Sequence, residues 1–400
     1  MKKYIFILFL IPFLLNGQVV EFEDSSKVDH NKYEPIFGNW FKVKKSGRMA
    51  LTSTDAITKE KGVKNVYPDY MGYLHSEDTL YHLQWYLKND SLFSAYGDSE
   101  YDNDVDADSA WKITVGDTNL VICIIDSGVD TTHPDLSANY GHLSENFYVD
   151  DFTFYHHGTA IAGLICAKSN NTAFFKGLAD SCRYINARIT STGSFPSSSA
   201  AEAILWAINK SPILNCSWGF GVTYPPVIKA AIEYYQKYNK SDFLIGNGGV
   251  TVFSAGNTGN EYPVTPAYYS PYDPTMLSVA ETDFDDVLSG SSTRNTSVDL
   301  CAPSYRTWIC YPYSEDEDGY YISYGTSYAA PLVTATAALI MSKYKGYFTA
   351  EDIVSLIKNS TDTIDSKNSD YSGKYGTGRL NSYRALKDAD KLIKKRNAIF

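Results

Sequence analysis

Four short stretches of the 400-residue sequence place side chains that could do chemistry beside strand-like or helix-like runs. IIDSGVD puts Asp126 at the end of an apolar run, and HHGTAIAG puts His157 before a helix-like run. VFSAGN puts Asn257 at another strand end, and GTSYAAP puts Ser327 at the start of a long apolar helix. A carboxylate, an imidazole, an amide and a hydroxyl are together what acyl transfer by a serine nucleophile needs.

The residues around Ser327 depart from an ordinary helix start. Gly325 allows a tight turn into the helix, and Pro331 lacks the N–H that would bond the Ser327 carbonyl. Ser327 lies where free N–H groups and the helix dipole favour negative charge. A serine here is also a common N-cap of a buried helix, so this stretch alone leaves both interpretations open.

The elements that must position these groups alternate from Trp111 onward. Strand-like runs such as NLVICIID, RYINARI and GVTVFSAGN are separated by helix-like runs such as SAAEAILWAIN and VIKAAIEYYQKY. Repeated strand–helix units predict an α/β fold, a three-layer sandwich with a mostly parallel central sheet. Ligands of such sheets bind at the carboxyl ends of the strands, and Asp126, Ser217 and Asn257 all follow strand ends.

Composition and charge narrow the class of protein. The chain is 44% hydrophobic and 20% charged, which is typical of a globular protein with one large domain and a smaller part. Its net charge of −11 argues against nucleic acid as a partner. Lys2 and Lys3 precede an apolar run that ends near Leu15, which predicts a signal peptide over residues 1–17 and a secreted or periplasmic protein. We expect no stable membrane span.

Two further features leave alternatives open. The six cysteines permit fifteen full pairings, and Cys301 and Cys310 are the pair to test first. The stretch GDSEYDNDVDADSAW places an acid at every second position from Asp98 to Asp108. These acids favour a solvated loop over a metal site.

The five quoted motifs resemble those of the subtilisin-like serine peptidases, or subtilases, over about residues 65–390. DSGVDTTHPDL, HGTAIAG and GTSYAAP resemble the Asp, His and Ser motifs of that family in its chain order, and NCSWG and SAGN resemble its substrate-binding strand ends. The resemblance implies an acyl-enzyme mechanism with Ser327 as nucleophile, His157 as base and then acid, and Asp126 orienting the imidazole. The Asn257 amide and the Ser327 N–H would hold the oxyanion.

The resemblance also implies a pocket for the residue before the scissile bond. It would be lined by Ser217, Trp218, Gly219, Ser254, Ala255 and Gly256. The loop after Asn257 aligns in two ways. One places Glu261 near the base of the pocket and favours a basic substrate side chain, and the other places Val264 there and favours an apolar one.

By the same resemblance the chemistry requires no cofactor, and two interpretations of one loop stay open, a structural Ca²⁺ site and an ordinary polar loop. Many relatives bind Ca²⁺ through an aspartate nine residues after the catalytic one and through a loop after the His helix. Here these are Asp135 and the loop KSNNTAFFKG. Asparagine and carbonyl oxygens in that loop suit Ca²⁺.

The domain prediction also follows the family. Residues 18–75 are expected to be a prosegment, shorter than usual and inhibitory if it folds, and residues 76–400 the peptidase domain. Autocleavage is expected between about Pro68 and Thr79. The expected partners are protein or peptide substrates and the chain's own prosegment, and we expect a monomer.

Two other functions remain to be weighed against a secreted serine endopeptidase. A maturation or peptide-ligating subtilase would form the same acyl-enzyme but use a restricted substrate or a chosen acceptor. A non-catalytic peptide-binding relative would need none of the four reactive groups, so their joint presence argues against it.

Overall fold

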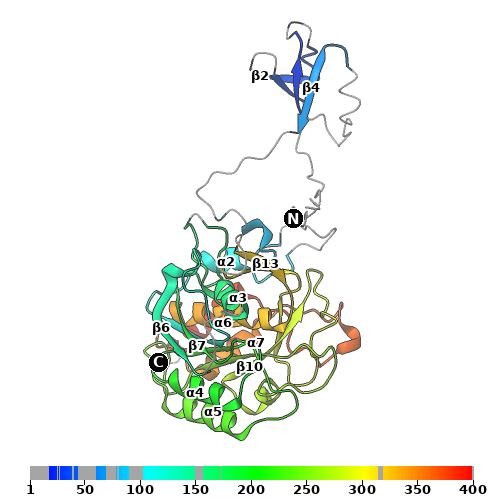
Figure 1. Ribbon diagram of the computed structural model, residues 1–400. Coiled ribbons are helices and arrows are strands. Elements are labelled where there is room, and N and C mark those ends of the chain that lie inside the picture. The colour runs from blue at the N-terminus through cyan, green and yellow to red at the C-terminus, as the bar shows by residue number, and fades with distance from the viewer. Residues whose placement is uncertain are drawn as a thin grey trace. The chain divides into compact units, whose positions relative to one another are not determined.

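The computed structural model describes residues 18–24, 26, 28–37, 40–43, 60–68, 78, 81–89, 102–148, 156–171, 173–313 and 319–398. The chain divides into two compact units, Met1–Leu74 and His75–Phe400 (Figure 1). The predicted signal peptide lies outside the described residues, as does most of the predicted cleavage window. Within the described ranges, no helix is long and apolar enough to cross a membrane.

The smaller unit is an antiparallel sheet of four short strands in the order β2-β3-β1-β4. Its strands are β1 (Gln18–Phe22), β2 (Tyr33–Phe37), β3 (Trp40–Val43) and β4 (Val63–Pro68). Val20, Val28 and Tyr33 are buried together, with Val63 and Val66 packed against them. The unit therefore has a small hydrophobic core of its own.

The larger unit is built on a seven-stranded parallel sheet in the order β11-β10-β9-β8-β5-β7-β6. Its strands are β5 (Val121–Asp126), β6 (Tyr140–Asn146), β7 (Arg183–Arg188), β8 (Ile213–Cys216), β9 (Val250–Ser254), β10 (Met276–Thr282) and β11 (Leu300–Pro303). The central strands are almost wholly buried, because helices cover both faces of the sheet, and this is why they read as continuous apolar runs. The predicted three-layer α/β fold is confirmed.

The helices of the larger unit form two layers (Figure 1). One hydrophobic core lies between the sheet and α3, α6, α7 and α8, and a second lies beneath α4 and α5. Helix α6 is buried on all sides from Tyr328 to Met341, which explains its apolar sequence. The helices are α2 (Ala107–Trp111), α3 (His156–Cys166), α4 (Ser197–Trp206), α5 (Pro226–Tyr238), α6 (Thr326–Lys343), α7 (Ala350–Asn359) and α8 (Ser382–Asn397).

Shorter elements complete the unit. A hairpin of β12 (Thr307–Cys310) and β13 (Tyr320–Ser323) pairs antiparallel and contacts α3. The 3-10 turns are η2 (Tyr81–Leu83), η3 (Ser137–Asn139), η4 (Ala267–Tyr272) and η5 (Ser369–Tyr371).

Two expectations differ from the structure. All six cysteines are free and buried, so Cys301 and Cys310 are not paired; the Cys301 thiol instead donates to the Tyr375 carbonyl, 3.2 Å away. The described part of the acidic stretch, from Asp102 to Asp108, is not simply a solvated loop. Asp104 is 5% exposed and accepts the backbone N–H groups of Asn89 and Asp106, each at 2.6 Å, so it shapes the chain locally.

Candidate active site

Asp126 and His157 meet where β5 ends and α3 begins. The His157 Nδ1 lies 2.8 Å from Asp126 Oδ1, and the Ser127 backbone N–H donates to the same oxygen at 2.7 Å. Burial by itself would lower the pKa of His157. The charge of Asp126 and its hydrogen bond outweigh burial and raise the pKa above its ordinary value.

The glycine after His157 lets α3 approach the loop after β5. A Cβ at Gly158 would lie 2.1 Å from the Gly128 carbonyl oxygen, closer than any side chain allows. The Gly158 N–H donates to Ser127 Oγ at 3.0 Å. The His-Gly pair therefore fixes the distance between the imidazole and the strand that carries Asp126. The neighbouring His156 stacks on Tyr311, with 5.0 Å between ring centroids.

Ser327 lies in the first turn of α6, and its contacts explain the unusual proline. Since Pro331 has no N–H, the Ser327 carbonyl accepts a hydrogen bond from Ser217 Oγ instead, at 2.8 Å. In return, the Ser327 hydroxyl donates to the Ser217 carbonyl at 3.2 Å. The residue after Ser327, Tyr328, has its ring centroid 5.7 Å from that of His157, so α6 begins beside the imidazole.

Asn257 follows β9 and is oriented by the first residue of α6. Its Oδ1 accepts the Thr326 backbone N–H at 2.9 Å and the Thr326 hydroxyl at 2.8 Å. With Oδ1 occupied in this way, the exposed amide presents Nδ2 as its donor. An amide donor thus lies near the free N–H groups at the N-terminus of α6.

The structure places Val264 and Glu261, the two candidates for the base of the pocket, in different surroundings. A Cβ on Gly219 would lie 2.5 Å from Val264 Cγ1, and one on Gly256 would lie 2.4 Å from Val264 Cγ2. Val264 therefore fills the space between these two glycine segments. Glu261 is 62% exposed and pairs with Lys374 Nζ at 2.5 Å, away from this space.

The other residues predicted to line the pocket differ in how far they are buried. Trp218 directs its side chain into the core, where Nε1 donates to the Ile125 carbonyl at 2.8 Å and the ring packs edge-on against Phe253. Its indole is therefore buried in the core, with 8% of the residue exposed. Ser254 and Ala255 are buried, whereas Gly256 is partly exposed.

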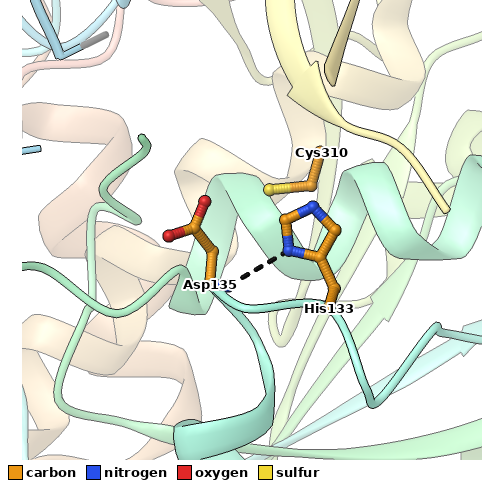
Figure 2. A group of neighbouring side chains, drawn as sticks. All are labelled: His133, Asp135 and Cys310. Carbon is orange, nitrogen blue, oxygen red and sulfur yellow. Dashed lines mark hydrogen bonds between the residues drawn. The ribbon is translucent and has the colours of Figure 1, made fainter. Parts of the chain in front are cut away.

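Asp135 lies in a buried group with His133 and Cys310, drawn in Figure 2. The Asp135 backbone N–H donates to His133 Nδ1 at 3.1 Å, so the ring proton is on Nε2, which faces the Gly319 carbonyl at 3.0 Å. Neither ring nitrogen keeps a lone pair for a metal. His133 and Asp135 therefore form a hydrogen-bonded pair in the core, and Cys310 lies beside them.

A second carboxylate, which the sequence reading did not single out, shares a loop with Asp135. Asp78 Oδ1 accepts the Asn170 N–H at 2.8 Å, and Asp135 accepts the Asn171 amide at 3.1 Å and the Tyr320 hydroxyl at 2.6 Å. Burial raises the pKa of Asp78 to about 6, and the neighbouring Asp135 charge contributes. Two mutually repelling buried carboxylates beside a loop rich in amide oxygens form a donor set that suits Ca²⁺.

Comparisons with known proteins show the family of the chain. The subtilase family model matches residues 117–378. Thermitase of Thermoactinomyces vulgaris is 32% identical over 309 residues, which cover 75% of this chain and 99% of thermitase. A calcium-dependent protease of Trichormus variabilis is 26% identical over 389 residues, covering 85% of this chain and 56% of that protein.

Solved structures show the same fold at lower identity. A protease of Pseudoalteromonas arctica matches with a TM-score of 0.64 and 20% identity, covering 78% of this chain and 99% of its own. The prenylagaramide maturation protease PagA matches with a TM-score of 0.60 and 21% identity. The match covers 71% of this chain and 98% of PagA. The family match and the similarity to thermitase show that the chain belongs to the subtilase family and is a serine endopeptidase.

Proposed function

We propose that the protein is an exported endopeptidase that hydrolyses peptide bonds through a triad of Asp126, His157 and Ser327. The observation that carries the proposal is the 2.8 Å hydrogen bond from His157 Nδ1 to Asp126, beside a serine in the first turn of α6. A carboxylate that fixes the imidazole tautomer leaves Nε2 to accept a proton.

The first half of the reaction forms the acyl-enzyme. The Ser327 hydroxyl turns from the Ser217 carbonyl towards the imidazole, gives its proton to Nε2 and attacks the substrate carbonyl. The oxyanion that forms is held by Asn257 Nδ2 and the Ser327 N–H. His157 then protonates the leaving amine, and the C–N bond breaks.

The second half repeats the proton transfers with water. His157 takes a proton from a water molecule, which attacks the acyl carbonyl and forms a second oxyanion in the same site. Collapse of this intermediate returns the proton to Ser327 Oγ and releases the carboxylic acid. Asp126 stays ionised throughout and stabilises the imidazolium.

The preferred residue before the scissile bond is apolar. Val264 places two methyl groups between Gly219 and Gly256, so the base of this pocket is uncharged and shallow. A basic side chain there would lose its hydration without gaining a carboxylate partner, since Glu261 pairs with Lys374 elsewhere. We therefore propose apolar side chains of moderate size as the best fit.

Export and maturation complete the proposal. Residues 1–17 act as a signal peptide, and residues 18–75 act as a prosegment that the enzyme removes by cleavage between about Pro68 and Thr79. A mature N-terminus outside this window would contradict the assignment. The mature enzyme acts as a monomer.

A structural Ca²⁺ would bind between Asp78 and Asp135, with the loop at 168–177 supplying amide or carbonyl oxygens. Bound there, the ion would neutralise two buried carboxylates. It has no role in the chemical steps, which the triad and the oxyanion donors perform.

The proposal is tested by comparing the wild type with Ser327→Ala, each expressed from residue 18. Casein hydrolysis and intact mass are followed together. We expect the wild type to hydrolyse casein and lose an N-terminal segment, and the variant to do neither. If both are inert at full mass, a general protease is excluded, and a dedicated maturation or ligation substrate or a binding role becomes the better account.

A further inference from the structure

Glu281 is a fully buried carboxyl at the end of β10 that the mechanism above does not use. It is 0% exposed, and burial raises the pKa of its carboxyl. Its Oε1 accepts the Gly325 backbone N–H at 2.7 Å, and its Oε2 accepts the Ser291 hydroxyl at 3.3 Å. Burying a carboxyl costs free energy, so its presence in the interior requires an explanation.

Gly325 is the residue that turns the chain into α6. Its φ of +131° is open to glycine, and a Cβ there would come within 3.1 Å of Asn257 Nδ2. Glu281 holds its N–H, and Ser304 Oγ donates to its carbonyl at 3.3 Å. The ends of β10 and β11 therefore fix this glycine from both sides.

The position of Gly325 determines where the two proposed oxyanion donors lie. The next residue, Thr326, binds Asn257 Oδ1 through both its N–H and its hydroxyl. The same hydroxyl accepts the Gly256 N–H at 3.1 Å. Ser327 follows directly, so a tilt at Gly325 moves both proposed oxyanion donors.

We propose that Glu281 is a positioning residue of the oxyanion hole. Its Oε1 fixes the Gly325 peptide by accepting the Gly325 N–H at 2.7 Å. Through Thr326 this contact aims Asn257 Nδ2 and the Ser327 N–H at the developing charge. The inference rests on the proposed roles of Ser327 and Asn257.

The test compares Glu281→Ala with Glu281→Gln on a peptide amide substrate. Active enzyme is counted with a serine-directed sulfonyl fluoride, so that misfolded protein does not contribute. The Ala variant should lose about 10- to 100-fold in kcat with KM within about twofold, because only the transition state uses the oxyanion donors. The Gln variant keeps an oxygen for the Gly325 N–H and should stay within about threefold of the wild type in kcat.

The matched control is Asp299→Asn. Asp299 is also buried and accepts a backbone N–H, from Ser278 at 2.8 Å, but it does not contact the α6 turn. It should leave kcat per active site unchanged. Should Glu281→Ala fail to fold, Ser304→Ala loosens the other side of Gly325 and should lower kcat by about 3- to 10-fold.

A double variant separates positioning from a general structural role. Because both residues act on one set of donors, Glu281→Ala should cost a smaller factor in kcat in an Asn257→Ala background than in the wild type, where it misplaces two donors instead of one. Losses that multiply, or an unchanged kcat in Glu281→Ala with an active wild type, would overturn the inference. A wild type that neither cleaves the substrate nor takes up the sulfonyl fluoride would instead overturn the proposed function.

Discussion

The two halves of the active site are held in different ways. In the base half, a buried carboxylate at the end of β5 binds the imidazole Nδ1, and this contact sets the tautomer and raises the pKa of His157. In the nucleophile half, side chains at the ends of β8, β9, β10 and β11 or just after them bind the turn that begins α6. These are Ser217, Asn257, Glu281 and Ser304.

The difference predicts how each half responds to damage. The base half depends on a charge, so one substitution should remove most of the activity without disturbing the fold. The nucleophile half depends on shared geometry, so single losses there should be partial and should depend on one another. The following experiments test this contrast, from the largest expected effect to the smallest.

Asp126→Asn should produce the largest loss. An amide in place of the carboxylate favours the wrong imidazole tautomer and no longer stabilises the imidazolium, which costs about 10⁴-fold in kcat in proteases with this triad. Steady-state kinetics with a peptide amide measure the effect, and circular dichroism checks the fold. A loss below about tenfold would remove Asp126 from the mechanism.

Among the four residues that hold the turn into α6, Asn257 should give the most severe loss when it is replaced by alanine. Removing one oxyanion donor of subtilisin costs about 10²–10³ in kcat, and a similar loss with little change in KM is expected here. The control is Asn247→Ala, an exposed amide that precedes β9, at the opposite end of the strand from Asn257, and donates to the Lys237 carbonyl; it should leave kcat unchanged. Equal kinetics for the two variants would mean that Asn257 holds no oxyanion.

Val264→Gly should change specificity more than rate. Without its methyl groups, the space between Gly219 and Gly256 deepens. Peptides with a large aromatic residue before the scissile bond should improve by about tenfold relative to alanine peptides, as expected for an apolar pocket that gains room. An unchanged preference would place the base of the pocket elsewhere.

The pH profile reports on the base half directly. His157 must be neutral to accept a proton, and its pKa is raised above the ordinary value of 6.5. The value of kcat/KM should therefore fall about tenfold per pH unit below a midpoint that lies above 6.5. In Asp126→Asn this midpoint should move to lower pH, and a midpoint that does not move would contradict the pairing.

The calcium proposal predicts a smaller effect on stability. The pKa of Asp78 is raised from 3.8 to about 6, so its stabilising contribution is complete below pH 3.8 and is lost as pH rises through about 6. At pH 8, millimolar Ca²⁺ should raise the melting temperature of EDTA-treated Ser327→Ala by a few degrees, about 2–4 °C per kcal/mol of binding. Asp78→Asn in that background should respond less.

An exposed acid provides the control for this prediction. Asp370→Asn removes a surface carboxylate and should respond to Ca²⁺ as the parent does. If Asp78→Asn responds fully, the ion binds elsewhere. If the parent does not respond, the loop is stabilised by its hydrogen bonds alone.

The sequence was informative where chemistry and local structure coincide. The alternating apolar runs predicted the parallel sheet, and the motifs placed Asp126, His157 and Asn257 at element ends, where the structure has them. Pro331 was flagged because a missing N–H is visible in the sequence. The hydrogen bond from Ser217 that replaces this missing donor was not visible in the sequence. Ser217 and Ser327 are 110 positions apart in the chain and meet only in the folded protein.

Contacts between residues that are distant in the chain could not be predicted from the local sequence pattern. Glu281 lies in an apolar strand, and its contact with Gly325 spans 44 residues. The Trp218 side chain turned into the core because a partner for its N–H, the Ile125 carbonyl, lies on the neighbouring strand. Asp78 and Asp135 are brought to one loop by tertiary packing, which a single sequence does not encode in any short motif.

The most direct test of the account is to label the wild type with a serine-directed sulfonyl fluoride and map the adduct by mass spectrometry. An activated serine reacts because a neighbouring base takes its proton. The account predicts one adduct per chain, on Ser327, that is lost in Ser327→Ala and nearly lost in His157→Ala. An unlabelled wild type, or an adduct on another residue, would contradict it.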